Sequence, residues 1–203
     1  MRLPIDIASV KGFMDPAEGA ALHAACLAAV GAKRPAVEIG GYCGKSAIYL
    51  GAACQAAGAR LFSIDHHRGS EENQPGWDYH DAELWDAEAG ALDTLPTFRR
   101  NLHRAGLEAS VIPVVGRSAD VAAIWGQPLG FLFIDGGHTQ AAADADFDGW
   151  SPHLAADGVL AIHDVFPNPA DGGRPPFEIY QRALASGWAE MAAVKSLRLL
   201  RRR

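Results

Sequence analysis

Two short motifs carry side chains that could do acid–base or metal chemistry. Asp135 and His138 lie in "FIDGGH", and His163 and Asp164 lie in "AIHDV". Each motif closes an apolar run typical of a buried strand, and parallel strands end at a shared edge of a sheet, so we expect these side chains to meet there. Two carboxylates at one edge repel each other unless a cation or a shared proton lies between them. We therefore predict a divalent-cation site, with Mg²⁺ as the ion because it prefers oxygen ligands and keeps positions for water and substrate.

The chemistry expected of such a site is deprotonation of a hydroxyl. A cation held by Asp135 and Asp164 would lower the pKa of a bound hydroxyl. His138 could then take the proton, because an unperturbed imidazole has a pKa near ~6.5. The residues leave other roles open: His138 could cap a helix that begins near Thr139, and His163 could be a hydrogen-bonded core histidine.

A glycine-rich turn follows the first apolar run, in "VEIGGYCGKS" (residues 37–46). A phosphate-binding loop and a dinucleotide-binding fingerprint both need a glycine at position 39, which is Ile. What remains is E-x-G-G-x-x-G, in which Gly40, Gly41 and Gly44 let the backbone lie against a ligand. Glu38 adds a negative charge, which suits an ammonium or sulfonium group better than a pyrophosphate. Simple turn formation is the alternative explanation for these glycines.

The elements that must position these residues follow from apolar periodicity. Short apolar runs predict strands at 35–39, 60–64, 110–115, 130–134 and 158–162. Segments of helical period predict helices at 14–31, 45–58, 94–105, 118–125, 140–154 and 175–187. Residues 188–203 read as an antiparallel hairpin with a turn near Lys195, and Asp15 is a plausible N-cap for the first helix. Alternating strands and helices indicate one α/β domain over 1–203, a doubly wound, Rossmann-like, mostly parallel sheet.

Residues 66–93 fit none of these elements. The segment combines Trp77, Tyr79 and Trp85 with histidines and acidic residues, and it begins where a strand ends. A connection of this length in a compact domain is usually a lid, a binding loop or a disordered segment, and its aromatic content argues against disorder. We expect a lid over the acceptor, with His66, His67 and Arg68 reading hydroxyl groups.

The glycine turn resembles the first motif of class I S-adenosylmethionine-dependent methyltransferases. That family has a seven-stranded sheet ending in an antiparallel hairpin, and an acidic residue at the end of its second strand holds the ribose hydroxyls. In this chain Asp65 stands there, although it could instead be a helix cap, and Ser118 follows the third strand near the expected adenine position. The predicted residues of the S-adenosylmethionine site are Glu38, Gly40, Gly41, Gly44, Ser46, Asp65, His66, Ser118 and Asp135.

The stretch "FIDGGH...D.D...W.P.L..DGVLAIHDV" resembles a branch of metal-dependent O-methyltransferases that includes macrolide-sugar methyltransferases. The lid sequence adds a likeness to methylmannose-polysaccharide methyltransferases. This resemblance implies Mg²⁺ binding by Asp135 and Asp164, with His138 as general base and a sugar or glycan hydroxyl as acceptor. Related branches place a further acidic or amide residue beside the second metal ligand, where this chain has His163 and Val165. The third protein ligand is therefore open among His163, Glu71, Glu72 and water.

The bulk composition limits the partners. A formal net charge of -6 argues against general binding to nucleic acid or anionic membrane. Three cysteines without metal-ligand spacing, and no apolar stretch long enough for a signal peptide or membrane span, indicate a cytoplasmic protein. A homodimer is expected. The competing functions are an NAD-dependent oxidoreductase and a non-catalytic nucleoside- or metal-binding regulator.

Overall fold

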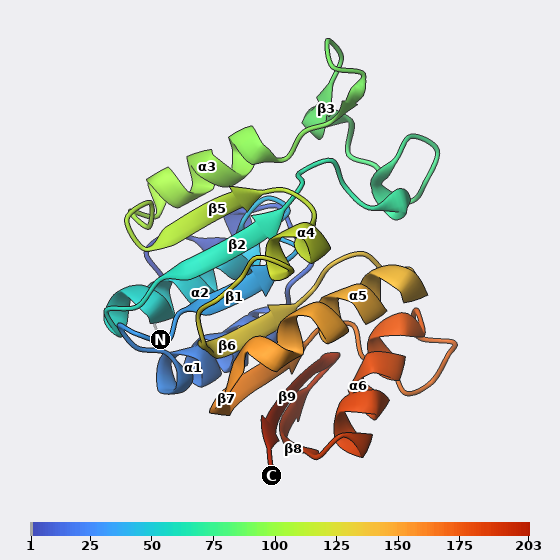
Figure 1. Cartoon of the computed structure of the whole chain (residues 1–203). Coiled ribbons are helices and arrows are strands. Elements are labelled where there is room, and N and C mark those ends of the chain that lie inside the picture. The colour runs from blue at the N-terminus through green and yellow to red at the C-terminus, as the bar shows by residue number, and fades with distance from the viewer. Residues whose placement is uncertain (1) are drawn as a thin grey trace.

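The computed structural model describes residues 2–203, which form a central sheet with helices on both faces (Figure 1). The sheet has seven strands in the order β5-β2-β1-β6-β7-β9-β8. Their bounds are β1 Ala36–Ile39, β2 Leu61–Asp65, β5 Val111–Val115, β6 Leu129–Ile134, β7 Leu154–Ile162, β8 Trp188–Val194 and β9 Leu197–Arg202. The first five strands are parallel, and β9 runs antiparallel to both β7 and β8. The predicted fold class and closing hairpin are confirmed.

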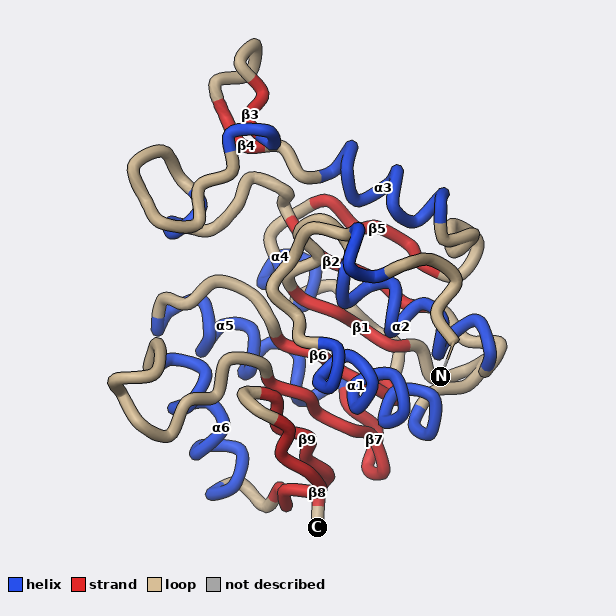
Figure 2. The backbone as a smooth tube through the Cα atoms, turned by 180° about the vertical axis from the view of Figure 1, so that it is seen from behind, coloured by secondary structure: helices blue, strands red, loops and turns tan. Residues whose placement is uncertain are grey.

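Strand burial explains why the central strands β1 and β6 are apolar at every position except Glu38. All of β1 and β6 is buried, and successive residues face opposite layers. Ala36 packs in the layer with α1, α2 and α3, whereas Val37 packs in the layer with α4, α5 and α6. The view from behind shows α1 and α2 covering the first face (Figure 2). The helices are α1 Pro16–Ala29, α2 Lys45–Ala56, α3 Leu95–Arg104, α4 Ser118–Ala122, α5 Gln140–Trp150 and α6 Pro175–Ala185.

Several element boundaries differ from the sequence prediction. The helix expected over 140–154 ends at Trp150, followed by a 3-10 turn, Ser151–His153. Pro152 in this turn has no backbone N–H to continue an α-helix. Strand β7 then begins at Leu154, four residues before the predicted start, and the helix expected over 118–125 ends at Ala122.

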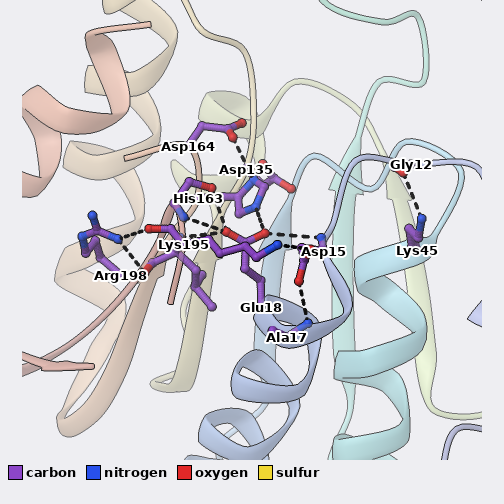
Figure 3. Close-up of polar contacts among 12 residues, drawn as sticks. Gly12, Asp15, Ala17, Glu18, Lys45, Asp135, His163, Asp164, Lys195 and Arg198 are labelled. Carbon is purple, nitrogen blue, oxygen red and sulfur yellow. Dashed lines mark hydrogen bonds and ion pairs between the residues drawn. The ribbon is translucent and has the colours of Figure 1, made fainter. Parts of the chain in front are cut away.

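The first helix begins as its sequence indicates. The Asp15 side chain accepts from Ala17 N, Pro16 occupies the first turn, and Glu18 Oε2 accepts from the backbone N–H of Asp15. These reciprocal contacts form a capping box that fixes where the helix starts. Gly19 lets α1 approach α2, because a Cβ there would lie 2.3 Å from the Tyr49 ring. The start of α1 is thereby held against the sheet, near the ends of β6 and β7 (Figure 3).

The segment 66–93 has short elements of its own and stands at the edge of the molecule (Figure 1). It contains 3-10 turns at Glu71–Asn73 and Ala82–Leu84 and a small hairpin of β3 Trp85–Asp86 with β4 Ala91–Leu92. Lys11 pairs with Asp81 and Glu83, which ties the segment to the chain before α1. Trp77 and Tyr79 are each 54% exposed. The lid function of this segment stays a prediction.

Among the described residues, no helix combines the length and apolar character required to cross a bilayer.

Candidate active site

The ends of β6 and β7 bring the two polar motifs together. Ile134 and Ile162 are partners in the parallel ladder, so Asp135 and His163 leave the sheet side by side. The backbone N–H of His163 still donates to Ile134 O, at 3.1 Å. Asp164 has a φ of 55°, a left-handed conformation that turns the chain sharply directly after His163.

Asp135, His163 and Asp164 form one cluster, with potential ligand atoms within 4.8 Å of one another (Figure 3). His163 Nδ1 lies 3.0 Å from Asp135 Oδ1 and 3.3 Å from Asp164 Oδ1. The predicted proximity of the two aspartates is therefore present, and a histidine nitrogen lies between them. The donor set includes neither Glu71 nor Glu72, which the sequence left open as third ligands.

A fourth residue, Glu18, completes this cluster from the first helix. Its Oε2 lies 3.1 Å from His163 Nε2, and its Oε1 accepts from Ser196 N, Ser196 Oγ and Leu197 N at the hairpin turn. Glu18 could not be recognised as a site residue from the sequence, because the capping box already accounts for a glutamate at that helix position. The surrounding sequence, "DPAEGAAL", contains no pattern that predicts a contact with a residue so distant along the chain.

The charges in the cluster compensate one another. Burial by itself would lower the pKa of His163, but the charge of Asp135 and hydrogen bonds to Asp135, Asp164 and Glu18 raise that pKa well above its usual value. Burial opposes ionisation of Glu18 as well, yet His163 and Ser196 lower the pKa of its carboxyl to about 2. An imidazolium can thus separate the two aspartates, where the sequence predicted a divalent cation.

His138 lies beside the cluster between two carboxylates. Its Nε2 is 3.1 Å from Asp164 Oδ2, and its Nδ1 is 3.3 Å from Glu72 Oε2 in the segment 66–93. The hydrogen bond to Asp164 raises the pKa of His138 to about 9, against burial, which lowers it. The expectation of an unperturbed pKa is therefore wrong. The alternative helix-capping role is wrong too, because the Thr139 hydroxyl accepts from Ala142 N at the start of α5.

The glycine turn is shaped by close contacts with its neighbours. Gly40 has a φ of 91°, and a Cβ there would lie 2.0 Å from the carbonyl oxygen of Asp135. Gly44, with a φ of 90°, is the N-cap of α2. A Cβ on Gly41 would lie 2.6 Å from Ser63 Oγ. Only glycine allows β1 to end this close to β6, so turn packing explains part of the motif, as the alternative reading held.

Asp65 joins the glycine turn to the segment 66–93. Its Oδ2 accepts from Tyr42 N at 2.8 Å and its Oδ1 from His67 N at 2.7 Å. Asp65 therefore caps a turn and not a helix. A carboxylate has further lone pairs, so these two contacts leave acceptor capacity for ligand hydroxyls. His66, by contrast, uses Nδ1 to accept from Arg68 N at an exposed position.

Glu38 lies deeper than the sequence argument required. It is 0% exposed, and burial raises the pKa of its carboxyl to about 7. Its Oε2 accepts from Ser63 Oγ at 2.6 Å, while Oε1 has no hydrogen-bond partner among the described residues. The expectation that Glu38 presents an exposed negative charge to a ligand is therefore wrong, because its side chain is buried behind the turn.

Ser118 and Ser46 lie in the first turns of α4 and α2. Ser118 Oγ accepts from Trp150 Nε1 at 2.8 Å. Asp146 is 5% exposed, and burial raises the pKa of its carboxyl to about 6. Ser46 is buried in the first turn of α2. The cofactor roles predicted for these two serines stay predictions.

The donor cluster fits a small divalent cation. Metal–ligand bonds of about 2.1 Å at right angles place neighbouring donor atoms about 3 Å apart. The separations from His163 Nδ1 to the two aspartate oxygens are 3.0 and 3.3 Å, which match this requirement. Oxygen atoms from two aspartates and one imidazole nitrogen are all common metal ligands.

Known proteins resemble this chain over most of its length. A family model described as a methyltransferase domain matches residues 37–165. Cofactor-bound Rv0187 from MTB superposes with a TM-score of 0.64 at 19% identity, covering 97% of this chain and 84% of that one. SAH-bound Podospora anserina methyltransferase PaMTH1 gives 0.62 at 13% identity, with 94% and 80% covered. The O-methyltransferase NovP gives 0.65 at 15% identity, with 90% and 78% covered.

Proposed function

Because the chain belongs to the methyltransferase-domain family, we propose that it transfers the methyl group of S-adenosylmethionine to a hydroxyl oxygen, with a sugar or glycan as the acceptor. One observation carries this proposal: a histidine flanked by carboxylates lies at the sheet edge where the glycine turn also ends. Similar structures that contain SAH or are O-methyltransferases support the same reaction. The NAD-dependent oxidoreductase alternative is not favoured, because position 39 lacks its glycine.

The glycine turn and its surroundings would hold the cofactor. Gly40, Gly41 and Gly44 present backbone without side chains, and the remaining lone pairs of Asp65 suit ribose hydroxyls. The carboxyl of Glu38, buried behind the turn, would favour the cofactor's cationic groups through its charge without contacting them. The sulfonium is intrinsically reactive, so these residues mainly need to align the methyl carbon with the acceptor oxygen.

His138 would take the acceptor proton at one of its ring nitrogens. Asp164 and Glu72 flank its ring and would stabilise the imidazolium formed by that transfer. Asp135, His163 and Asp164 would hold a divalent cation, for which the sequence analysis predicts Mg²⁺. When bound, such a cation lowers the pKa of the acceptor hydroxyl. The rings of Trp77 and Tyr79 are exposed and would stack on the faces of a sugar acceptor.

The test is transfer of a labelled methyl group from S-adenosylmethionine to a panel of glycosides, phenols and macrolides. We expect a glycoside product, and calorimetry should show binding of S-adenosylmethionine but not of NAD⁺. Binding of NAD⁺ alone would favour the oxidoreductase. Binding of S-adenosylmethionine without transfer to any hydroxyl compound would favour the non-catalytic regulator.

A further inference from the structure

Glu18 is a buried carboxylate that the proposed reaction does not use directly. It is 3% exposed and lies 145 residues from His163 in sequence, yet the two side chains meet behind the aspartate pair. Figure 3 shows Glu18 reaching up from α1 between His163 and the turn of the β8–β9 hairpin. The helix cap needs only one of its oxygens, so capping does not explain the full set of contacts.

The contacts of Glu18 keep a proton on Nε2 of His163, so that Nδ1 is the nitrogen that releases its proton when a cation binds. Oε1 accepts from Ser196 N at 2.8 Å, Ser196 Oγ at 2.8 Å and Leu197 N at 3.2 Å. A carboxylate held by three donors is ionised and has no proton to give, so His163 must donate to Oε2 from Nε2. Nδ1, the nitrogen on the other side of the ring, consequently faces the oxygens of Asp135 and Asp164.

We propose that Glu18 is a positioning residue, which orients His163 so that Nδ1 joins Asp135 and Asp164 as the third ligand of a divalent cation, and that this site prefers Mn²⁺ to Mg²⁺. A histidine ligand that donates its other N–H to a carboxylate is a recurring arrangement in metal sites. Mn²⁺ binds oxygen ligands as Mg²⁺ does, but as a transition ion it also accepts an imidazole nitrogen, even though it is the weakest binder of the first-row series, whereas Mg²⁺ favours oxygen ligands throughout. The inference rests on the proposed function, in which the cation assists methyl transfer. It replaces the predicted Mg²⁺ by Mn²⁺.

Metal binding can be measured without turnover. The full chain is titrated with Mn²⁺ while the signal of free Mn²⁺ is followed by electron paramagnetic resonance, and with Mg²⁺ by calorimetry, both with S-adenosylhomocysteine present. We expect Mn²⁺ to bind about tenfold or more tightly than Mg²⁺. His163→Asp, which replaces nitrogen by oxygen, should remove most of that preference.

Glu18→Gln tests the positioning role with almost no change in size. The donors from Ser196 and Leu197 require an oxygen at the Oε1 position, so the new NH₂ group must face His163 Nε2. Nε2 then accepts, and the proton moves to Nδ1, where it blocks the cation. Loss of an outer carboxylate of this kind typically lowers metal affinity by about 10- to 100-fold, and we expect a loss of that size for Mn²⁺.

Asp15→Asn is the matched control. It makes the same acid-to-amide change at the same helix start, retains an N-cap side chain, and leaves the Glu18–His163 contact in place. Its Mn²⁺ affinity should equal that of the wild type, with circular dichroism confirming that all variants fold. Wild-type protein that binds Mg²⁺ as tightly as Mn²⁺, or that binds neither, overturns the inference. So does a Glu18→Gln variant with unchanged Mn²⁺ affinity.

The two proposals fail in distinguishable ways. Methyl transfer in the presence of EDTA by protein that binds no Mn²⁺ would overturn the metal inference, leave the methyltransferase standing and identify the His163 imidazolium as the only cation between the aspartates. Mn²⁺ binding by protein that binds no S-adenosylmethionine would overturn the methyltransferase proposal and leave the metal inference standing.

Discussion

At the scale of single residues, His138 shows how neighbours set acid–base behaviour. Asp164 and Glu72 both favour its protonated form, and its pKa is raised to about 9. A base must be neutral to accept a proton, so the competent fraction of His138 grows as the pH rises toward that pKa. The same two carboxylates make the neutral ring a stronger base than a free imidazole.

His138→Ala should slow methyl transfer by roughly 10²- to 10⁴-fold, the usual scale for loss of a general base. Affinity for S-adenosylmethionine, measured by calorimetry, should stay near the wild-type value because the side chain faces Asp164 and Glu72. Unimpaired turnover in this variant would exclude His138 from the mechanism.

Glu72→Gln should move the pH dependence of transfer in a defined direction. Removing its negative charge lowers the pKa of His138, so the rate should reach its plateau at a lower pH than in the wild type. Glu71→Gln is the control, since the neighbouring Glu71 is exposed and Glu72, not Glu71, contacts His138. Identical pH–rate profiles for the wild type and both variants would argue against this contact in the working enzyme.

At the scale of elements, the site depends on how closely α1 lies against α2. Gly19 allows the approach, and Tyr49, which is 1% exposed, fills the space that a side chain at position 19 would need. The next residue toward the N-terminus is Glu18, so the same packing places the carboxylate against His163. Helix propensity alone would favour alanine at position 19 by about 1 kcal/mol.

Gly19→Ala should therefore destabilise the protein in spite of that propensity. A Cβ 2.3 Å from the buried Tyr49 ring forces a shift of α1, and overpacking of this kind costs about 1–3 kcal/mol. Thermal unfolding should show a lower Tm for this variant. Gly31→Ala, at a glycine with open space around its Cβ position, should change the Tm little. A Tm for Gly19→Ala equal to or above that of the wild type would contradict the close packing described.

At the scale of the whole molecule, buried charge makes stability depend on pH. Asp146 lies under the α4–α5 contact at 5% exposure, and its pKa is raised from 3.8 to about 6 by burial. A carboxyl whose folded pKa is raised adds stability below its unfolded pKa, and this contribution is lost as the pH rises through the folded pKa. The window runs from about pH 4 to about pH 6, and the shift corresponds to about 3 kcal/mol.

Asp146→Asn should remove this dependence, because an amide does not titrate. Denaturant unfolding of wild type and variant at several pH values should show the wild type losing free energy of unfolding relative to the variant between about pH 4 and pH 6. Asp148→Asn, at an exposed residue paired with Arg182, should give the wild-type pattern. A constant difference between Asp146→Asn and the wild type across that window would show that Asp146 is not buried as a neutral acid.

The sequence by itself determined the fold class and most of the elements. Apolar runs such as 130–134 and the hairpin turn at Lys195 are local patterns, and Lys195 does adopt a positive φ of 50°. The meeting of Asp135 with Asp164 was equally accessible, since it follows from a parallel sheet whose strands end at one edge. Some predicted boundaries were wrong, such as the helix extended to residue 154. The helical period of the sequence continues to the first residue of β7, which pairs with β6 only in the folded sheet.

Tertiary structure alone decided the electrostatics of the site. A pKa depends on which charges lie within a few ångströms, and the partners of His163 and His138 come from α1, the segment 66–93 and the ends of two strands. Glu18 looks like an ordinary capping residue until folding brings the hairpin turn and His163 to it. Local patterns record periodicity and turns, whereas the identity of a buried neighbour far along the chain is fixed only when the two faces of the sheet are packed.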